Sequence, residues 1–311
     1  MSAERPHILL IDGMALLFRS FFATAVRKQF QYNEEGIPTN GVQGFLRHTL
    51  TAVNLFQPTH IAVCWDMGAV TFRNDMYDGY KANRPAPAPE LVPQFDMARQ
   101  ASEAMGWKNY GVEGMEADDL IGSLVKTWKA DADVTVVSGD KDLLQLLAPS
   151  VRIALTKKGH SIYDVYTEAR FIEDYGMTPA QFIDYKAFIG DTSDGYPGVK
   201  GIGPKTALKL IQTYGTAEEV VNSLDKLTSS EKNKIQDNLA MLHLSKELAT
   251  IHCEVDLGKS LESLEISDYD EQTEAHLRKH GLNSVLKQLL TADLIPAARG
   301  SLDERIIDPF K

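Results

Sequence analysis

Cysteine is scarce in this sequence, and long apolar runs are absent from it. Cys64 and Cys253 are its two cysteines, and neither belongs to a Cys-x-x-Cys pair. A disulfide scaffold or a thiolate zinc site is therefore excluded, and we expect two buried, reduced thiols in a cytoplasmic protein. No apolar stretch approaches the roughly 18 residues that span a membrane. The start, MSAERPHILLIDG, lacks the layout of a signal peptide, so we expect no membrane association.

The chain also lacks an excess of basic residues. It has 43 Asp and Glu against 32 Lys and Arg, a net charge of −11. Taken alone, this charge favours an ordinary acidic protein over a nucleic-acid binder, because phosphate binding usually requires a basic surface. Net charge does not report where the charges lie, however, and acids that converge on bound cations leave a less negative site. The 311 residues, 43% of them hydrophobic, predict one large or two ordinary globular domains.

The first half of the chain alternates short β-rich runs with helical patterns, which is typical of an α/β fold. Buried strands are predicted at residues 7–11 (HILLI), 60–65 (HIAVCW) and 134–137 (VTVV). Helices are predicted near residues 41–56, 91–105 and 118–128. We therefore predict an α/β core with a parallel sheet over residues 1–175. Residues 83–93 (NRPAPAPELVP) are rich in Pro and Ala and indicate an extended or mobile segment.

The second half changes character and is predicted to be mainly helical. Residues 151–166 indicate a hairpin, and residues 167–175 a helix ended by Gly176. Thr178 and Pro179 open a further helix that runs to about Ile189. One last helix is predicted over residues 271–290. These patterns predict a helical region at residues 176–290 and a C-terminal tail at residues 291–311.

Acidic residues follow each of the three predicted strands. Because the carboxyl ends of parallel strands meet at one edge of a sheet, these acids are expected to converge. Further acids stand at the start of the helix near residue 118 and on a glycine-flanked turn. The nine acids at such positions are Asp12, Asp66, Glu116, Asp118, Asp119, Asp140, Asp142, Asp191 and Asp194.

For any one of these acids, a helix cap or a turn residue is the commoner role. Nine carboxylates packed together would repel one another unless cations bind between them. Carboxylate and water oxygens are the ligands that Mg²⁺ and Mn²⁺ prefer. Two such ions roughly 4 Å apart can clamp the attacking and leaving oxygens of a phosphodiester. The set as a whole therefore indicates a two-metal site for phosphodiester hydrolysis.

Five segments in order resemble the motifs of the 5′ nuclease family, which includes the 5′–3′ exonuclease domain of bacterial DNA polymerase I, the phage 5′ nucleases and the flap endonucleases. They are IDGMALLFR, CWDMGAVTFRNDMYDGYKANRP, EGMEADDLIG, VVSGDKDLLQLL and GDTSDGYPGVKGIGPKTA. The resemblance runs from Ile8 to at least Leu210, and more weakly to Leu290. It implies a PIN-like parallel-sheet core followed by a helical region with a helix–hairpin–helix. The match is nearest to stand-alone bacterial or phage members, without a polymerase domain.

The resemblance also implies roles for the acids. One metal ion is implied at Asp12, Asp66, Glu116 and Asp118. A second is implied at Asp140, Asp142, Asp191 and Asp194, with Asp119 supporting the cluster. None of these acids is missing, which favours an active enzyme. The departure is Gly195, where the family usually has Asn, and it bears on the geometry of the Asp191–Asp194 turn.

Basic residues gather in FRNDMYDGYKANRP. For such a stretch alone, a solvated polar loop is the commoner interpretation. The resemblance implies instead an arch over the acids, at about residues 73–95, that steers phosphate. The implied catalytic residues are Arg73, Tyr80, Lys81 and Arg84, with Lys81 and Arg84 neutralising the scissile phosphate and Tyr80 stacking on a base. Arg19 is a further candidate for DNA binding.

Residues 198–207 (GVKGIGPKTA) allow three interpretations. A nucleotide-binding loop needs contiguous Gly-Lys-Thr, which Pro204 interrupts, and a preceding strand. A plain helix–turn–helix core is the second. The third is a helix–hairpin–helix, here residues 190–211, whose backbone amides bind DNA phosphates without reading sequence. The resemblance implies the third, with a bound K⁺ and with DNA contacts at Gly198, Lys200, Gly201, Gly203, Lys205 and Thr206.

The sequence therefore predicts a monomeric, divalent-metal-dependent 5′–3′ exonuclease or 5′-flap endonuclease. Its expected substrates are DNA with 5′ flaps, duplex with 5′ ends, and RNA primers on DNA. Two alternatives stay open, a PIN-type RNA nuclease and a non-catalytic DNA-junction binder. A phosphatase with an aspartyl nucleophile would need an acid two residues after Asp12, where Met14 stands.

Overall fold

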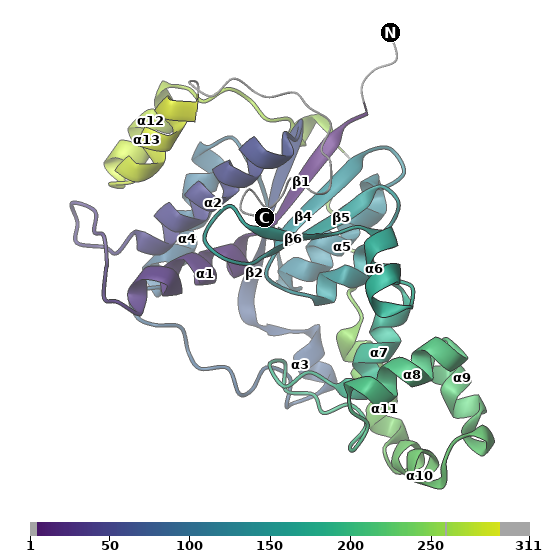
Figure 1. The fold of residues 1–311 in the computed structure, drawn as a ribbon. Helices are drawn as coiled ribbons and strands as arrows, with labels where there is room; N and C mark the ends of the chain where they lie inside the picture. The colour runs from purple at the N-terminus through teal and green to yellow at the C-terminus, as the bar shows by residue number, and fades with distance from the viewer. Residues whose placement is uncertain (1–4, 259, 293–311) are drawn as a thin grey trace.

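The computed structural model describes residues 5–258 and 260–292. Its centre is one six-stranded sheet in the order β3-β2-β1-β4-β5-β6 (Figure 1). Every pairing is parallel except that of β5 with β6. The strands are β1 (His7–Asp12), β2 (His60–Thr71), β3 (Lys108–Gly114), β4 (Asp133–Ser138), β5 (Val151–Thr156) and β6 (Tyr163–Tyr166). The predicted parallel sheet and the antiparallel hairpin after it are confirmed.

Helices cover both faces of the sheet, which is why its central strands are apolar throughout. In β1, Leu9 and Ile11 pack under one layer of helices, whereas Ile8 and Leu10 point to the opposite layer. The first layer contains α1 (Gly13–Ala25), α2 (Asn40–Phe56) and α4 (Val92–Ala104). The second contains α5 (Ala117–Trp128) and the short helix η1 (Asp142–Leu146).

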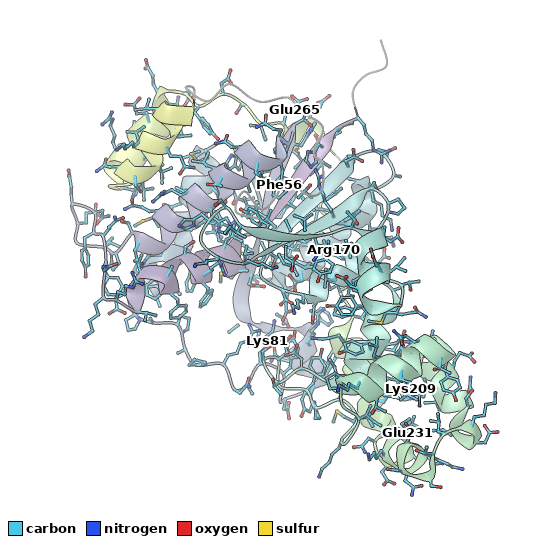
Figure 2. The ribbon with its side chains drawn as sticks, viewed as in Figure 1. Phe56, Lys81, Arg170, Lys209, Glu231 and Glu265 are labelled. Carbon is cyan, nitrogen blue, oxygen red and sulfur yellow. The ribbon has the colours of Figure 1, made fainter. Side chains whose placement is uncertain are left out.

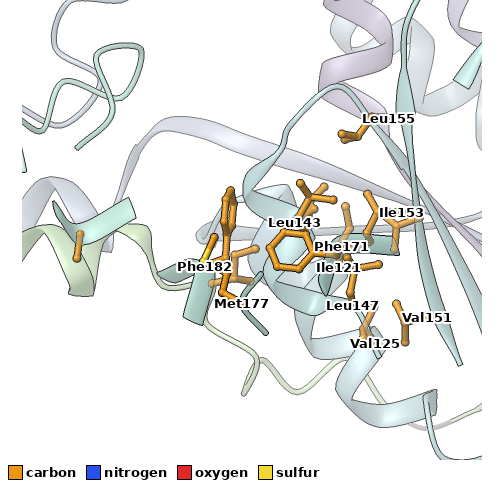
Figure 3. Packing of buried hydrophobic residues seen from close by; sticks show 14 of the residues in the cluster. Ile121, Val125, Leu143, Leu147, Val151, Ile153, Leu155, Phe171, Met177 and Phe182 are labelled. Atoms are coloured by element: carbon orange, nitrogen blue, oxygen red, sulfur yellow. The ribbon is translucent and has the colours of Figure 1, made fainter. Parts of the chain in front are cut away.

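The sheet and the helical region share one hydrophobic core. Phe171 of α6 (Glu168–Tyr175) lies beside Ile121 of α5, and Phe182 of α7 (Gln181–Ile189) continues the packing (Figure 3). The rings of Phe171 and Phe182 meet edge to face with centroids 5.6 Å apart. This continuous core fixes α7 relative to the carboxyl edge of the sheet.

The helical region extends from α7 at the lower right of Figure 1. It contains α8 (Pro204–Tyr214), α9 (Ala217–Asn222), η2 (Leu224–Lys226), α10 (Ser229–Asp237) and α11 (Leu239–Ala249). α7 and α8 are joined by the hairpin of residues 190–203, the arrangement expected of a helix–hairpin–helix. Two further helices, α12 (Glu271–Lys279) and α13 (Asn283–Ala292), follow η3 (Glu262–Leu264) and lie beside α2 and α4. No helix within the described residues is long and apolar enough to cross a membrane.

Several local predictions are wrong. β3 has an exposed, polar sequence (KNYGVEG) and was not predicted. β2 continues past residue 65 to Thr71, so Asp66 lies within the strand, at a register shift. The single last helix is two, because Gly281 takes a φ of +66° between α12 and α13. The predicted tail, beyond the end of α13 at residue 292, lies outside the described residues.

Gly198 serves the hairpin's own packing. Its φ is +63°, and a Cβ there would stand 2.4 Å from the backbone nitrogen of Gly190 and 2.5 Å from the carbonyl oxygen of Phe188. The residue is buried, so the expectation that Gly198 lets the backbone approach a DNA phosphate is wrong. Gly201 and Gly203 are exposed just before α8. A Cβ at Gly203 would meet nothing within 4 Å, whereas one at Gly201 would stand 3.1 Å from Cε of Lys234.

Gly198→Ala should therefore destabilise the protein by at least about 2 kcal/mol, through left-handed strain and a backbone clash. Gly36 is the matched control, because its φ is +75° and a Cβ would meet nothing within 4 Å. Gly36→Ala should lose about 1 kcal/mol, from strain alone. Urea unfolding of both variants measures the difference, and equal losses would contradict the packing role of Gly198.

Candidate metal centre

Backbone amides at the ends of strands and helices hold the acids of the sheet edge. Asp12 ends β1 and caps α1, so that its Oδ1 accepts a hydrogen bond from the Ala15 amide at 2.9 Å. Its Oδ2 accepts from the Ser138 hydroxyl at 2.6 Å, at the end of β4. Asp66 accepts from the Ala117 amide, the first residue of α5, at 2.8 Å. These bonds aim the carboxylates at one edge of the sheet, as the strand order requires.

The turn between α7 and the hairpin brings the remaining acids to the same edge. Asp191 Oδ1 accepts from the amide and the hydroxyl of Ser193 and from the Asp194 amide, which closes the turn. Asp140 and Asp142 lie nearby, and their charges, with those of the turn, raise the pKa of Tyr196 after burial itself. The charges of the four acids predicted for the second ion thus all act on one tyrosine. The Tyr196 hydroxyl is buried and has no hydrogen-bond partner within the described residues.

The pKa values show that these acids repel one another. Burial, followed by the charges of nearby Asp66 and Asp140, raises the pKa of Asp12 to about 7. Burial and then Asp140 raise the pKa of Asp142 to about 7. The pKa of Asp118 is raised by burial and then by Asp140, Asp12 and Asp66. Burial is the largest cause of each shift, and the neighbouring carboxylates add to it.

The chain's own basic side chains offset part of this repulsion. Lys81 Nζ lies 2.9 Å from Glu116, and an Arg84 nitrogen lies 2.7 Å from Asp194. Lys186, on α7, bridges Asp142 at 2.8 Å and Asp191 at 2.5 Å. In the view of Figure 2, Lys81 lies below the sheet, on the side of the helical region.

Lys186 was not predicted from the sequence. Its signal is a lysine within an apolar stretch (DYKAFI), five residues before Asp191. Burial opposes the charge of Lys186, but the carboxylates of Asp142 and Asp191 outweigh burial and raise its pKa.

The donor set fits a hard divalent cation. Its ligand atoms are carboxylate oxygens, which suit Mg²⁺ or Mn²⁺, and the orphaned Tyr196 hydroxyl adds a polar atom in need of a partner. Across residues 5–258 and 260–292, however, no three His, Cys, Asp or Glu side chains stand close enough to form a cage as they lie. Lys81, Arg84 and Lys186 form ion pairs with four of these acids, Glu116, Asp194, Asp142 and Asp191.

Asp119 and Arg73 form a buried pair away from solvent. Arg73 is 2% exposed and donates from both terminal nitrogens to Asp119 at 2.8 Å, and also to the carbonyl oxygens of Leu248 and Thr250. Asp119, fully buried, further accepts from the His252 and Glu116 amides. The structure thus contradicts the expectation that Arg73 faces a phosphate. Asp119 accepts from the amide of Glu116, which agrees with the supporting role that the resemblance implies for it. The pair fixes the start of α5 to α3 (Phe72–Met76) and α11.

Tyr80 is likewise buried, with 2% of its surface exposed. Its hydroxyl lies 3.1 Å from Glu116 and 3.4 Å from Asp194, so the expectation of base stacking is wrong for this structure. Arg19 donates to the carbonyl oxygen of Lys157. Lys200 and Lys205 are exposed beside Gly201 and Gly203, and Thr206 is half-buried.

Two family models together match most of the chain. Residues 7–176 match the one described as "5'-3' exonuclease, N-terminal resolvase-like domain". Residues 177–272 match "5'-3' exonuclease, C-terminal SAM fold".

Curated relatives extend this likeness. A Bacillus subtilis (strain 168) protein named 5'-3' exonuclease is 50% identical over 291 residues, which cover 93% of this chain and 98% of that protein. DNA polymerase I of the same organism is 37% identical over 92% of this chain, but the match spans 32% of its own length.

Solved structures share the fold. The T5 D15 protein co-crystallized with metal ions superposes with a TM-score of 0.66 at 22% identity, covering 91% of this chain and 98% of its own. The catalytic core of Rad2 in complex with DNA substrate gives a TM-score of 0.60 at 12% identity, covering 93% of each chain. The predicted PIN-like fold with a helical C-terminal region is confirmed by these comparisons.

The buried position of Arg73 predicts a loss of stability on substitution. Arg73→Met should destabilise the protein by about 3–5 kcal/mol, because it leaves Asp119 charged, buried and unpaired. Adding Asp119→Leu should recover much of that loss, since the unpaired charge is then removed. Urea unfolding of both single variants and the double variant measures the coupling. An Arg73→Met protein of full stability would contradict the buried pair.

The repulsion among the acids predicts stabilisation by divalent cations. Mg²⁺ or Mn²⁺ should raise the melting temperature, and Asp118→Asn should raise it without any cation, by about 2–4 °C per kcal/mol of relieved repulsion. The same variant should respond less to added cation, because a predicted ligand is removed. Thermal scans with and without EDTA measure both effects. Asp118→Asn protein that melts below wild type in EDTA would argue against repulsion at this site.

Proposed function

The chain belongs to the 5′-3′ exonuclease family, and from that premise we propose that it hydrolyses phosphodiester bonds of DNA from 5′ ends and at 5′ flaps. The reaction uses two divalent cations, Mg²⁺ or Mn²⁺, held by the acids of the sheet edge. The Bacillus subtilis relative supports this activity most directly, because it bears the exonuclease name and is matched over nearly its whole length. The DNA polymerase I relatives are matched over about a third of their length, so only their matched part bears on this chain.

One observation carries the proposal. Carboxylates from β1, β2, the start of α5 and the α7 turn meet at one edge, and Lys81, Arg84 and Lys186 already neutralise part of their charge. Asp12, Asp66, Glu116 and Asp118 form one side of the proposed site. Asp140, Asp142, Asp191 and Asp194 form the other. Bound there, the cations would activate water and stabilise the charge that develops on the leaving oxygen.

Lys81 and Arg84 act on the phosphate in this proposal. Each now pairs with a carboxylate that a divalent cation would take over. Once released, the ammonium and the guanidinium can contact the scissile phosphate from the side opposite the acids. Cationic groups fixed in this way contribute most where negative charge increases in the transition state.

The hairpin between α7 and α8 is the proposed grip on duplex DNA. Gly201, Gly203, Lys200 and Lys205 are exposed together. α8 begins at Pro204, which has no N–H, so the amides of Lys205 and Thr206 are its first donors without an intrahelical partner. Helix N-termini bind phosphates through such amides, without base contacts. The same proposal includes a K⁺ ion at the hairpin and RNA primers on DNA as further substrates. We also propose that the enzyme is a monomer, divided into an α/β core (residues 1–175) and a helical region (residues 176–290).

Cleavage of a 5′-flap oligonucleotide under single-turnover conditions tests the proposal. Asp12→Asn should abolish cleavage while DNA affinity is largely kept, because binding rests on the hairpin and the arch segment. Lys81→Ala and Arg84→Ala should each lower the saturated rate by roughly a hundredfold, or about 2.7 kcal/mol, as expected for loss of one preorganised electrostatic contact.

Two other results would point elsewhere. In one, Lys81→Ala and Arg84→Ala keep the wild-type saturated rate but bind DNA more weakly, with a flatter salt dependence of binding. Both residues would then only attract DNA electrostatically. Binding without cleavage by the wild-type protein, at any Mg²⁺ or Mn²⁺ concentration, would identify a non-catalytic DNA-junction binder.

A further inference from the structure

Two glycines bring the start of the arch segment against the turn that carries Asp194. Gly195 has a φ of +81°, and a Cβ there would stand 2.4 Å from the carbonyl oxygen of Gly79. A residue with any side chain at position 195, such as the Asn usual in the family, would force the two segments apart.

Hydrogen bonds and an ion pair extend the contact, which we call the latch (residues 79–84 against residues 192–195). The Lys81 amide donates to the Asp194 carbonyl oxygen at 2.7 Å. The Asn83 side chain donates to the Thr192 carbonyl oxygen at 2.9 Å, and Arg84 pairs with the Asp194 carboxylate. The latch thus joins the arch segment to one side of the acid cluster.

Lys81 itself is held in an unfavourable conformation. Its φ is +54°, in the left-handed region that residues with a side chain rarely adopt. Such strain persists where the surroundings over-determine it. Here the latch fixes the Lys81 backbone, and Glu116 holds its ammonium at 2.9 Å.

The far end of the arch segment is anchored elsewhere. The Gln94 side chain, fully buried, accepts from the amides of Gly41 and Val42 at 2.7 and 3.1 Å and so caps α2. Its amide nitrogen donates back to Asn40 and to the Glu90 carbonyl oxygen. The latch therefore governs the near end of the segment, where Lys81 and Arg84 lie.

We infer that Gly195 is a positioning residue: the latch that it permits holds Lys81 and Arg84 on Glu116 and Asp194 until divalent cations take over those carboxylates. Lys81 and Arg84 compete with cations for the same oxygens, so closing the latch lowers the apparent affinity of the site for metal. That the released side chains then serve the phosphate rests on the proposed function. The latch itself does not.

Trypsin provides a direct probe, because Lys81 is followed by Ala82 whereas Pro85 protects the bond after Arg84. In EDTA, cleavage after Lys81 should be slow in wild type and about tenfold faster or more in Gly195→Ala, since proteolysis follows the population of the opened segment. Gly215→Ala is the matched control: its φ is +92°, and a Cβ there meets only the Gln181 amide nitrogen, at 3.6 Å. It should be cleaved after Lys81 at the wild-type rate.

Mn²⁺ titration completes the test. Added Mn²⁺ should accelerate cleavage after Lys81 in wild type but add little in Gly195→Ala, and Gly195→Ala should bind Mn²⁺ more tightly by calorimetry. Asn83→Ala, which removes one exposed hydrogen bond of the latch, should shift both measurements in the same direction and serves if Gly195→Ala does not fold. The inference would be overturned if both variants were cleaved after Lys81 at the wild-type rate and bound Mn²⁺ with the wild-type affinity. If the protein behaves as the latch predicts but does not cleave flap DNA, the proposed function is refuted and the latch is not.

Discussion

Repulsion among carboxylates is the constraint on which the rest of this structure depends. Parallel strands, the start of α5 and the turn after α7 all deliver acids to one sheet edge, and burial raises the pKa of Asp12 and of Asp142 to about 7. A folded chain tolerates such a cluster only if positive charge reaches it. Lys81, Arg84 and Lys186 supply part of that charge. A protein with a net negative charge can therefore still be proposed to act on DNA, because basic side chains offset the acids at the site itself.

The charged residues divide into those that form the site and those that hold it. Arg73 and Asp119 satisfy each other in the interior and tie α3, α5 and α11 together. They act on the site through Glu116, whose amide donates to Asp119. Lys81 lies at the boundary between the two groups, with its backbone in the latch and its ammonium on a carboxylate. The buried Arg73–Asp119 pair can thus keep the site folded while metal ions replace the Lys81 ammonium on its carboxylate.

Sequence patterns predicted the parts of the fold that periodicity and chain connectivity determine. The apolar strands β1, β2 and β4 and the positions of the acids after them follow from burial on both faces of a parallel sheet. β3 could not be predicted, because its exposed and polar residues lack the apolar pattern of a buried strand. The pairing of Arg73 with Asp119 and that of Lys186 with Asp142 could not be predicted either, because these partners lie 46 and 44 residues apart in the chain. Only the packing of α3 against α11 and of α7 against η1 brings them together. Motif likeness alone assigned Arg73 to the phosphate, where the structure gives it to Asp119.

Anomalous diffraction from crystals soaked in Mn²⁺ tests the central claim most directly, because it locates the ions and the side chains together. The account predicts two peaks at the sheet edge, one among Asp12, Asp66, Glu116 and Asp118 and one among Asp140, Asp142, Asp191 and Asp194. It also predicts that Lys81 and Arg84 will have left Glu116 and Asp194. Crystals with no peak at this edge, and with both basic side chains still paired to their carboxylates, would contradict it.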